Sequence, residues 1–369
     1  MGRVTGTFST DAVSSATQNK RVVLEPLLRR IMPQAMADGM VKVAIVRNLT
    51  GGDYGRQFLE SCINEGRSMG FIVDSFVLSG ENEQNKNKIL QIAGADYDGI
   101  IFSLVGEGIS YNDLLPHIDR KIKIVTFDNL PYKDDDLRKD ALYGVTSAAQ
   151  DDRGLAEISL SAMIESFASV MEPVRVISVI ANPGIPLLDN RYDVYNRFIS
   201  EGKIVEVAGI RPAGFDHIRS SIRETLIKTL ADFPVGSFDA IWAPYDEFAK
   251  GCFDALNEAG RNEILLTSID ISNDNIKLML DNADQWIATA ATDPSVAGII
   301  IMRILAAKLA GEETPSAYTF KAQLIKSSML NQTITMANIT SHIPGWLSSH
   351  GVFEFPWMIE LKNCVAGRR

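Results

Sequence analysis

The sequence predicts an α/β fold built from two similar modules, each a parallel sheet with helices on both faces. Strand-like and helix-like patterns alternate along most of the chain, with short connections between them. The stretch 121–129 is a Val- and Ile-containing strand that ends in Asp128 and Asn129, and the stretch 264–270 repeats this pattern and ends in Asp270. Because ligands of open α/β sheets bind at the carboxyl ends of strands, the two acids are the first candidates for a binding site.

The first module follows an N-terminal segment, residues 1–20, that is rich in Ser, Thr and Gly. A helix is expected within 21–36, limited by Pro26 and Pro33. The expected strands are 41–46, 71–78, 98–103 and 121–129, and the expected helices are 57–69, 82–93 and 112–120. An acidic loop at 133–140 and a short strand at 142–146 end the module.

The second module repeats this architecture after a long helix expected at 151–172. The expected strands are 174–180, 204–209, 240–243, 264–269 and 287–290, and the expected helices are 188–201, 215–232 and 246–259. A helix at 295–310 and a strand at 318–325 follow. The last 40 or so residues hold Trp346, Phe353, Phe355 and Trp357 at irregular spacing, and their pattern predicts no fold.

The composition is that of an ordinary soluble protein and excludes several classes of function. Hydrophobic residues make up 46% of the chain and charged residues 22%. The net charge of -10 argues against nucleic acid as the main partner, because phosphate binding requires a basic surface. No apolar run is long enough to cross a bilayer, and the N-terminus does not resemble a secretory signal. Cys62 and Cys252 fall in helical patterns and are interpreted as buried small hydrophobic residues.

The motifs of common enzymes are absent from the sequence. It contains no dinucleotide-binding glycine motif, P-loop, nucleophile elbow or zinc-protease motif. Its four His residues are not spaced for catalysis or for a metal. The interpretation of Asp128 and Asp270 as a catalytic acid/base pair is weak, because no substrate-activating group accompanies them in the sequence. We therefore expect no enzyme activity, no cofactor and no metal.

Several short segments, in order and spacing, resemble the periplasmic sugar-binding proteins of ABC importers, of the ribose- and galactose-binding type. These segments are 46–49, 98–103, 125–129, Phe215-Asp216, 243–249, 268–270 and 288–294, and the resemblance covers about residues 41–326. It implies two doubly wound parallel-sheet lobes joined by a hinge of three crossovers, here near Val145, Thr292 and Lys326. The N-terminal lobe would hold 41–145 and 293–326, and the C-terminal lobe 146–292 with the segment 327–369. Transcription repressors share this core, but residues 1–40 are too loose for their DNA-binding helices.

The resemblance also implies a set of ligand-binding residues between the lobes. The positions that match are Asn48, Tyr54, Ser103, Asp128, Asn129, Asp189, Phe215, Tyr245, Asp270 and Thr292. Two positions where the family commonly has Arg hold Asn129 and Asp189, and Arg191 lies two residues beyond the second. With both arginines missing, a ligand with more donors and no ring oxygen is favoured, so sugar alcohols are candidates beside pyranoses.

The chemistry of these residues suits a polyhydroxylated ligand. An ionised Asp only accepts hydrogen bonds and can take two hydroxyl protons, while aromatic rings pack on C–H faces. Other interpretations remain open: Asp128, Asp270, Asp189, Ser103 and Thr292 are also residues that cap helices or form turns. Tyr54 and Phe215 are equally typical of a core, and Asp246 suits a helix N-terminus.

The leading hypothesis is therefore capture of a sugar or sugar alcohol for an ABC-type importer. The expected protein is a periplasmic monomer that meets the importer's permease and no nucleic acid, with its signal peptide absent from this chain. A ligand-sensing module that delivers a sugar signal to a membrane receptor is the alternative, because it would use the same cleft. A sugar-converting enzyme is the third possibility.

Overall fold

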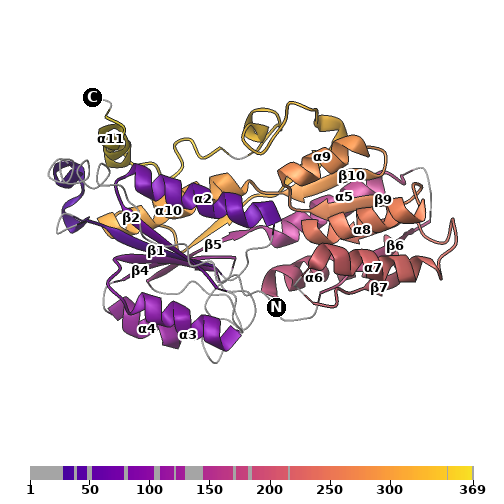
Figure 1. Cartoon of the computed structure of the whole chain (residues 1–369), viewed down its shortest axis with the longest axis horizontal. Coiled ribbons are helices and arrows are strands. Elements are labelled where there is room, and N and C mark those ends of the chain that lie inside the picture. The colour runs from indigo at the N-terminus through magenta and orange to yellow at the C-terminus, as the bar shows by residue number, and fades with distance from the viewer. Residues whose placement is uncertain are drawn as a thin grey trace, which may run out of the picture.

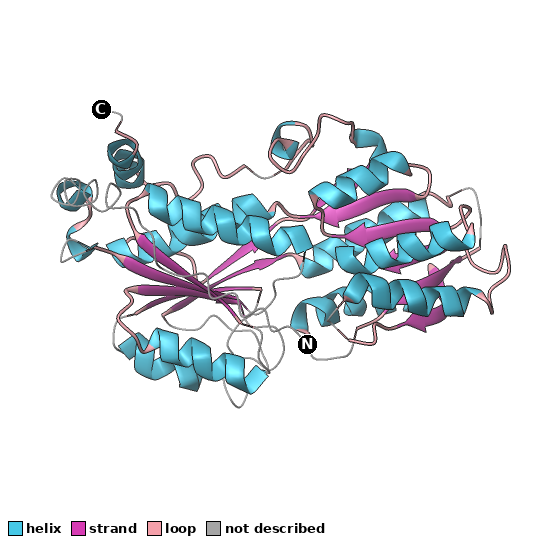
Figure 2. Cartoon of the chain, viewed as in Figure 1, coloured by secondary structure: helices cyan, strands magenta, loops and turns pink. Residues whose placement is uncertain are grey.

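The computed structural model describes most of the chain as two α/β lobes side by side (Figures 1 and 2). The described residues are 28–36, 40–47, 52–78, 82–103, 109–119, 122–128, 144–168, 172–181, 185–214, 217–346 and 348–367. Most of residues 1–40, the expected N-terminal extension, lies outside these ranges, but Leu28, Met32 and Met36 are buried in the core of the first lobe. No helix within the described ranges is long and apolar enough to cross a membrane.

The first lobe is built on a six-stranded parallel sheet in the order β11-β5-β4-β3-β1-β2. Its strands are β1 (Lys42–Arg47), β2 (Ile72–Val77), β3 (Gly99–Ser103), β4 (Lys123–Phe127), β5 (Val145–Gln150) and β11 (Ala317–Phe320). Helices α2 (Gly52–Ser68) and α10 (Pro294–Ala310) cover one face, and α3 (Asn82–Ala93) and α4 (Tyr111–Asp119) cover the other (Figure 1). The central strands are buried on both faces, which explains their continuous apolar runs.

The second lobe repeats this plan with the order β12-β10-β9-β8-β6-β7, in which only β12 runs antiparallel. Its strands are β6 (Val174–Val179), β7 (Ile204–Ile210), β8 (Ala240–Ala243), β9 (Leu265–Ile269), β10 (Trp286–Ala291) and β12 (Gln323–Lys326). Helices α5 (Asp152–Glu165) and α6 (Pro186–Ser200) pack on one face. On the other face lie α7 (Ile218–Leu230), α8 (Asp246–Ala259) and α9 (Asn273–Asp281). Of these three helices, α9 is the one that the sequence pattern did not predict.

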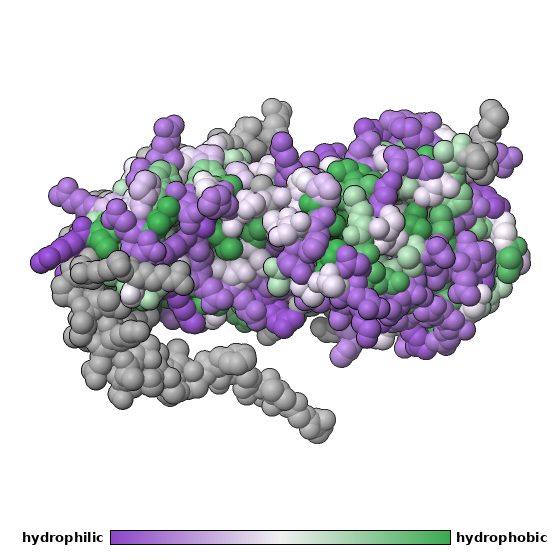
Figure 3. Space-filling model, turned by 90° about the horizontal axis from the view of Figure 1, so that it is seen from above, coloured by the Kyte–Doolittle hydropathy of each residue, from purple (hydrophilic) through white to green (hydrophobic). Residues whose placement is uncertain are grey.

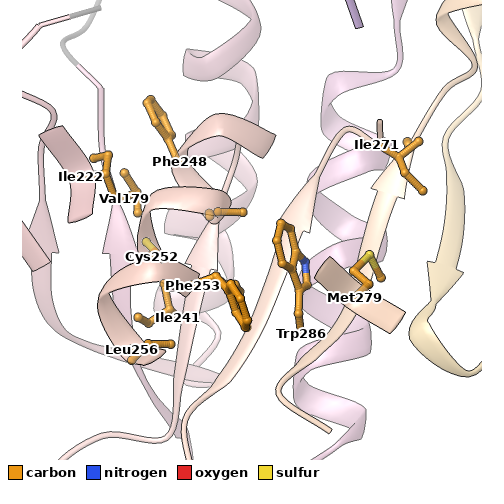
Figure 4. Close-up of a cluster of buried hydrophobic side chains, with 14 of the residues drawn as sticks. Val179, Ile222, Ile241, Phe248, Cys252, Phe253, Leu256, Ile271, Met279 and Trp286 are labelled. Atoms are coloured by element: carbon orange, nitrogen blue, oxygen red, sulfur yellow. The ribbon is translucent and has the colours of Figure 1, made fainter. Parts of the chain in front are cut away.

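The core under α7, α8 and α9 is dense with large side chains (Figure 4). Phe253 of α8 and Trp286 of β10 pack with ring centroids 6.1 Å apart, beside Cys252 and Met279. All three cysteines are free and buried, so the interpretation of Cys62 and Cys252 as small hydrophobic residues is confirmed.

Three crossovers join the lobes, as expected, but two of them differ in position from the expectation. Strand β5 stays in the first sheet to Gln150, so the first crossover follows residue 150 instead of 145. The second follows β10, next to Thr292 as expected. The single strand expected at 318–325 is two strands in different sheets, so the third crossover lies at Lys321-Ala322 instead of Lys326.

The C-terminal segment lies along both lobes, which differs from its expected place on the C-terminal lobe alone. Its first part, with Ile334, Ile339 and Trp346, is buried in the second-lobe core. Its last helix, α11 (Pro356–Val365), buries Met358 and Leu361 in the first-lobe core. Figure 1 shows this segment returning from the second lobe to the first. Residues that serve two cores show no single period, which is why their pattern predicted no fold.

Candidate functional site between the lobes

Asp128 and Asp270 occupy equivalent places in the two lobes. Each directly follows the third strand of its sheet order, β4 or β9. Both adopt left-handed backbone conformations, with φ of 66° and 73°, which Asp tolerates better than most residues. Each N–H donates to a carbonyl of the next strand, Asp128 to Ala148 at 3.1 Å and Asp270 to Ala290 at 2.8 Å. The same strained turn thus brings an acid to the carboxyl edge of both sheets.

In the second lobe, Asp270 forms part of a buried charge cluster with Arg191 and Asp152. Arg191 of α6 is 1% exposed, and its Nε donates to Asp152 Oδ1 at 3.0 Å. Its Nη1 donates to the carbonyl of Pro244 at 2.6 Å and to Asp270 Oδ2 at 3.3 Å. The other oxygen of Asp270, Oδ1, is buried without a hydrogen-bond partner. Burial raises the pKa of Asp270, although Arg191 opposes the shift.

Asp270 does not cap the helix that follows it. The cap of α9 is Ser272, whose hydroxyl accepts from the N–H of Asn275. This excludes the capping interpretation of Asp270. The same holds for Thr292, because Asp293 caps α10 by accepting from the N–H groups of Ser295 and Val296.

A second buried acid, Asp246, lies in the first turn of α8. It is 1% exposed, and neither carboxylate oxygen has a hydrogen-bond partner, although Lys250 Nζ lies 3.2 Å from Oδ2 as an ion pair. Burial raises the pKa of Asp246 to about 7, and the neighbouring Asp270 and Glu247 add to the shift. The unpartnered oxygens of Asp246 can accept hydrogen bonds from a ligand that brings donors.

Tyr54 and Thr292 connect the first lobe to the crossover region. The Tyr54 hydroxyl lies 3.4 Å from Thr292 Oγ1, which donates to Gln150 Oε1 at 2.7 Å. Burial raises the pKa of Tyr54, and the charges of Asp128 and Asp270 raise it further. Acids from both lobes therefore lie near this phenol.

Asp128 is likewise influenced by charges of both lobes. Burial is the main cause that raises its pKa to about 7. Arg47 of the first lobe lowers this pKa, while Asp152, Arg191 and Asp270 of the second lobe also act on it. The strand-end acids and Arg191 therefore form one electrostatic cluster between the lobes.

The remaining predicted residues have varied positions. Ser103 ends β3 with its hydroxyl buried and without a partner. Asp189 lies in the first turn of α6, half-buried, and the residue at the N-cap is Ile185. Tyr245 precedes α8 and packs edge-to-face on Phe248, with centroids 5.3 Å apart. The predicted residues Asn48, Asn129 and Phe215 lie outside the described residues.

The structure corrects the expectation that the second arginine of the site is missing. Arg191, two residues after Asp189 on α6, contacts Asp270. The sequence interpretation also missed Arg47, Gln150 and Asp152: Arg47 ends β1, and Gln150 and Asp152 lie at a strand end and a helix start beside the first crossover. The argument that favoured a ligand without a ring oxygen therefore loses one of its two supports.

The cluster is rich in hydrogen-bonding groups and suits recognition of a polar ligand. Free acceptors are provided by Asp270 and Asp246, and free donors by Arg47 and Ser103. In the described part of the chain, no three His, Cys, Asp or Glu side chains are grouped as a metal site. Hydroxyl groups of a ligand could donate hydrogen bonds to the acids and accept hydrogen bonds from a guanidinium.

Comparison with known proteins agrees with this architecture. The chain matches the model of the periplasmic binding protein domain over residues 43–313. It is similar to the structure of a sugar ABC transporter from Yersinia enterocolitica, with 30% identity, a TM-score of 0.81 and coverage of 90% of this chain and 98% of that chain. No curated protein matches the chain in sequence.

Two more distant structures share the fold. One is the 5-methylthioribose transporter solute binding protein from Thermotoga lettingae in complex with 5-methylthioribose, with 25% identity, a TM-score of 0.75 and coverage of 88% of this chain and 98% of that chain. The other is the periplasmic binding component of the arabinose ABC transporter from Shewanella sp. ANA-3, with 19% identity, a TM-score of 0.68 and coverage of 78% and 93%. The predicted fold and the family resemblance are thus confirmed, and the chain belongs to the periplasmic binding protein family, with the type I fold of two α/β lobes.

Proposed function

We propose that this protein captures a sugar or sugar alcohol between its lobes and delivers it to an ABC-type importer. The observation that carries the proposal is the pair of strand-end acids, Asp128 and Asp270, in one electrostatic cluster. The relatives from Yersinia enterocolitica and Thermotoga lettingae are described as a sugar transporter protein and a 5-methylthioribose-binding protein, which supports a sugar-like ligand.

Hydroxyl groups fit the acceptors of the site. A buried carboxylate oxygen without a donor, such as Oδ1 of Asp270, is costly until a ligand supplies one. A sugar hydroxyl supplies that donor, and a hydrogen bond to a charged group is worth about 1.5–3 kcal/mol. We propose that the ligand-binding residues are those predicted from the sequence, with Arg191 and Asp152 holding Asp270 in place.

Ligand capture would close the two lobes about their three crossovers. Residues of both lobes surround the site, so a ligand that bonds to Asp128 and Asp270 together favours the closed arrangement. Small-angle scattering should therefore show a smaller radius of gyration with ligand. Unchanged dimensions at saturating ligand would count against a hinge.

The other expected properties also belong to this proposal. The protein would act outside the cytoplasmic membrane, meet the importer's permease and bind its solute without converting it. We expect a monomer, because exposed large hydrophobic side chains such as Val77, Val205 and Val235 belong to separate elements. Figure 3 agrees for the face that it shows, where hydrophilic residues spread over both lobes and hydrophobic residues form smaller groups.

A thermal-shift panel of aldoses, ketoses and alditols tests the function directly. A bound ligand raises the melting temperature by mass action, so at least one member should stabilise the wild-type protein. The Asp128→Asn and Asp270→Asn variants should lose this shift. If no member stabilises the wild type, the proposal of a sugar ligand is wrong, and turnover of a stabilising sugar would mean an enzyme.

A further inference from the structure

Arg47 is a buried cation, and two of its donor nitrogens have no partner in the described part of the chain. It is the last residue of β1 and is 6% exposed. Its Nε and Nη1 have no hydrogen-bond partner. Two other deeply buried arginines differ: Arg191 bonds to Asp152, Asp270 and a carbonyl, and Arg303 bonds to Glu65, Glu354 and two carbonyls.

The guanidinium of Arg47 packs on two buried aromatic rings next to residues of the candidate site. Its central carbon is 4.6 Å from the ring centroid of Phe58 and 5.5 Å from that of Phe127. Phe127 directly precedes Asp128, and Phe58 lies one helical turn after Tyr54 on α2. The charge of Arg47 acts on both Asp128 and Tyr54. Two residues of the candidate site therefore flank the cation.

Neighbouring strand ends supply a second unsatisfied group. Arg47 pairs in register with Ser103 of β3, and both point to the face that α2 covers, since they alternate with residues of the opposite face. The Ser103 hydroxyl is buried without a partner. The carboxyl ends of β1 and β3 thus present free donors beside the acid that ends β4.

Packing on aromatic rings offsets only part of the cost of burying this charge. A cation over a ring gains about 0.5–2 kcal/mol, whereas leaving buried donors of a charged group unpaired costs more. A side chain with such a cost is typical of a functional position, where a ligand provides the missing partners.

We propose that Arg47 is a specificity-determining ligand contact that donates to an oxygen which only accepts, the ring oxygen of a cyclic sugar. This inference rests on the proposed function. A hydroxyl that accepts from Arg47 must also place its own hydrogen, and Asp128 is the nearby acceptor. A ring oxygen satisfies Arg47 and leaves Asp128 free for an adjacent hydroxyl. The site therefore favours a cyclic sugar over its open-chain alditol, in contrast to the preference expected from the sequence.

The test compares an aldose with the alditol of the same configuration, chosen from the sugars that stabilise the wild type. In calorimetry, the wild type should bind the aldose at least tenfold more tightly than the alditol. Arg47→Met keeps the length and apolar packing of the side chain and should reduce this preference to less than threefold. An unchanged preference in Arg47→Met, or a preference of the wild type for the alditol, would overturn the inference.

Melting of the ligand-free variants separates a ligand contact from a structural residue. Because Arg47 has unpaired buried donors, Arg47→Met should raise the melting temperature, by about 2 °C or more. The matched control is Arg303→Met, which removes a buried arginine of α10 that has partners on all three nitrogens, and it should lower the melting temperature without changing sugar preference. A loss of stability in Arg47→Met equal to that in Arg303→Met would make Arg47 structural. If the wild type binds no sugar at all, the proposed function fails; if it binds but Arg47→Met behaves as wild type, only this inference fails.

Discussion

The indole Nε1 of Trp346 donates to Oδ2 of Asp293 at 3.0 Å and ties the C-terminal segment to the second crossover. Asp293 is 5% exposed and uses its other oxygen to cap α10. Both oxygens are thus occupied by protein groups, directly beside Thr292 of the candidate site. The C-terminal segment therefore supports the hinge region as well as the two cores.

Trp346→Phe should destabilise the protein without loss of fold. The variant keeps an aromatic ring in the second-lobe core but leaves Oδ2 of the buried Asp293 with the long contact to Thr340 at 3.5 Å. Hydrogen bonds to charged groups contribute about 1.5–3 kcal/mol, which sets the expected loss. Urea unfolding measures it. In Trp357→Phe the partner is the more exposed Glu312, so this control should lose less.

Shortening the side chain of Met358 should show that α11 packs in the first-lobe core. Met358 is fully buried among residues of α2 and α10, so Met358→Ala should cost about 2–5 kcal/mol of unfolding free energy. Ile359 is the next residue of the same helix and is 45% exposed, so Ile359→Ala should change stability by less than about 0.5 kcal/mol. Equal effects in the two variants would contradict the placement of α11.

Asp270→Asn should weaken sugar binding more than it weakens the fold. The substitution keeps the shape but replaces one acceptor by a donor, so we expect an affinity loss of about 2–3 kcal/mol, near a hundredfold. Arg191 keeps Asp152 and the Pro244 carbonyl as partners, which limits the loss of stability. Titration calorimetry and melting of the ligand-free protein measure the two effects.

A surface acid of the same lobe provides the control for this variant. Asp254 of α8 pairs with Arg219 of α7, with Nε and Oδ2 2.6 Å apart and both side chains partly exposed. Asp254→Asn should leave affinity unchanged and alter stability by less than about 1 kcal/mol. If Asp270→Asn loses more stability than affinity, Asp270 serves the fold through Arg191 and is not a ligand residue.

The strand-end acids were predictable from the sequence because their signal is local. A short buried strand followed by Asp needs only adjacent residues, and the repeat at 264–270 strengthens it. Arg191 was not found because the family pattern directed attention to Asp189. Residues two positions apart on a helix point about 200° apart, so they face different surroundings. The buried residues of α6, Leu188, Arg191, Val194, Tyr195 and Phe198, have helical spacing, and this period places Arg191 on the inner face.

Arg47 and the C-terminal segment show two further limits of sequence patterns. Arg47 follows the apolar run of β1, where a charge is usually interpreted as the solvent-exposed end of a strand. Only the strand order, which places β1 between β3 and β2, reveals that this end is covered. The split of the C-terminal segment between two cores depends on where the lobes lie in space, and no periodicity encodes that.

Stability of the ligand-free protein should fall as the pH rises from about 4 to about 7. The pKa of Asp246 is raised by burial from its ordinary value of 3.8 to about 7, so the folded state keeps a proton that the unfolded state releases in this range. The folded state is then favoured most at pH values below the ordinary pKa. As the pH rises further, each proton that only the folded state retains lowers the free energy of unfolding by about 1.4 kcal/mol per pH unit. The trend should level off above pH 7. Asp128, with its pKa also near 7, adds to it in the same direction.

Asp246→Asn isolates this contribution. Its amide cannot ionise, and Lys250 keeps Glu247 as a partner at 2.7 Å, so the variant should unfold less readily than the wild type at pH 7.5 and show a shallower slope between pH 4 and 7. Asp96→Asn is the matched control: Asp96 is an exposed acid whose pKa is lowered by a hydrogen bond from Lys42, so it is ionised in both states above pH 5. Urea unfolding across this pH range measures the slopes. An Asp246→Asn slope equal to that of the wild type would mean that Asp246 is already ionised in the folded protein, held by Lys250, and that its buried carboxylate has no proton to lose when a ligand binds.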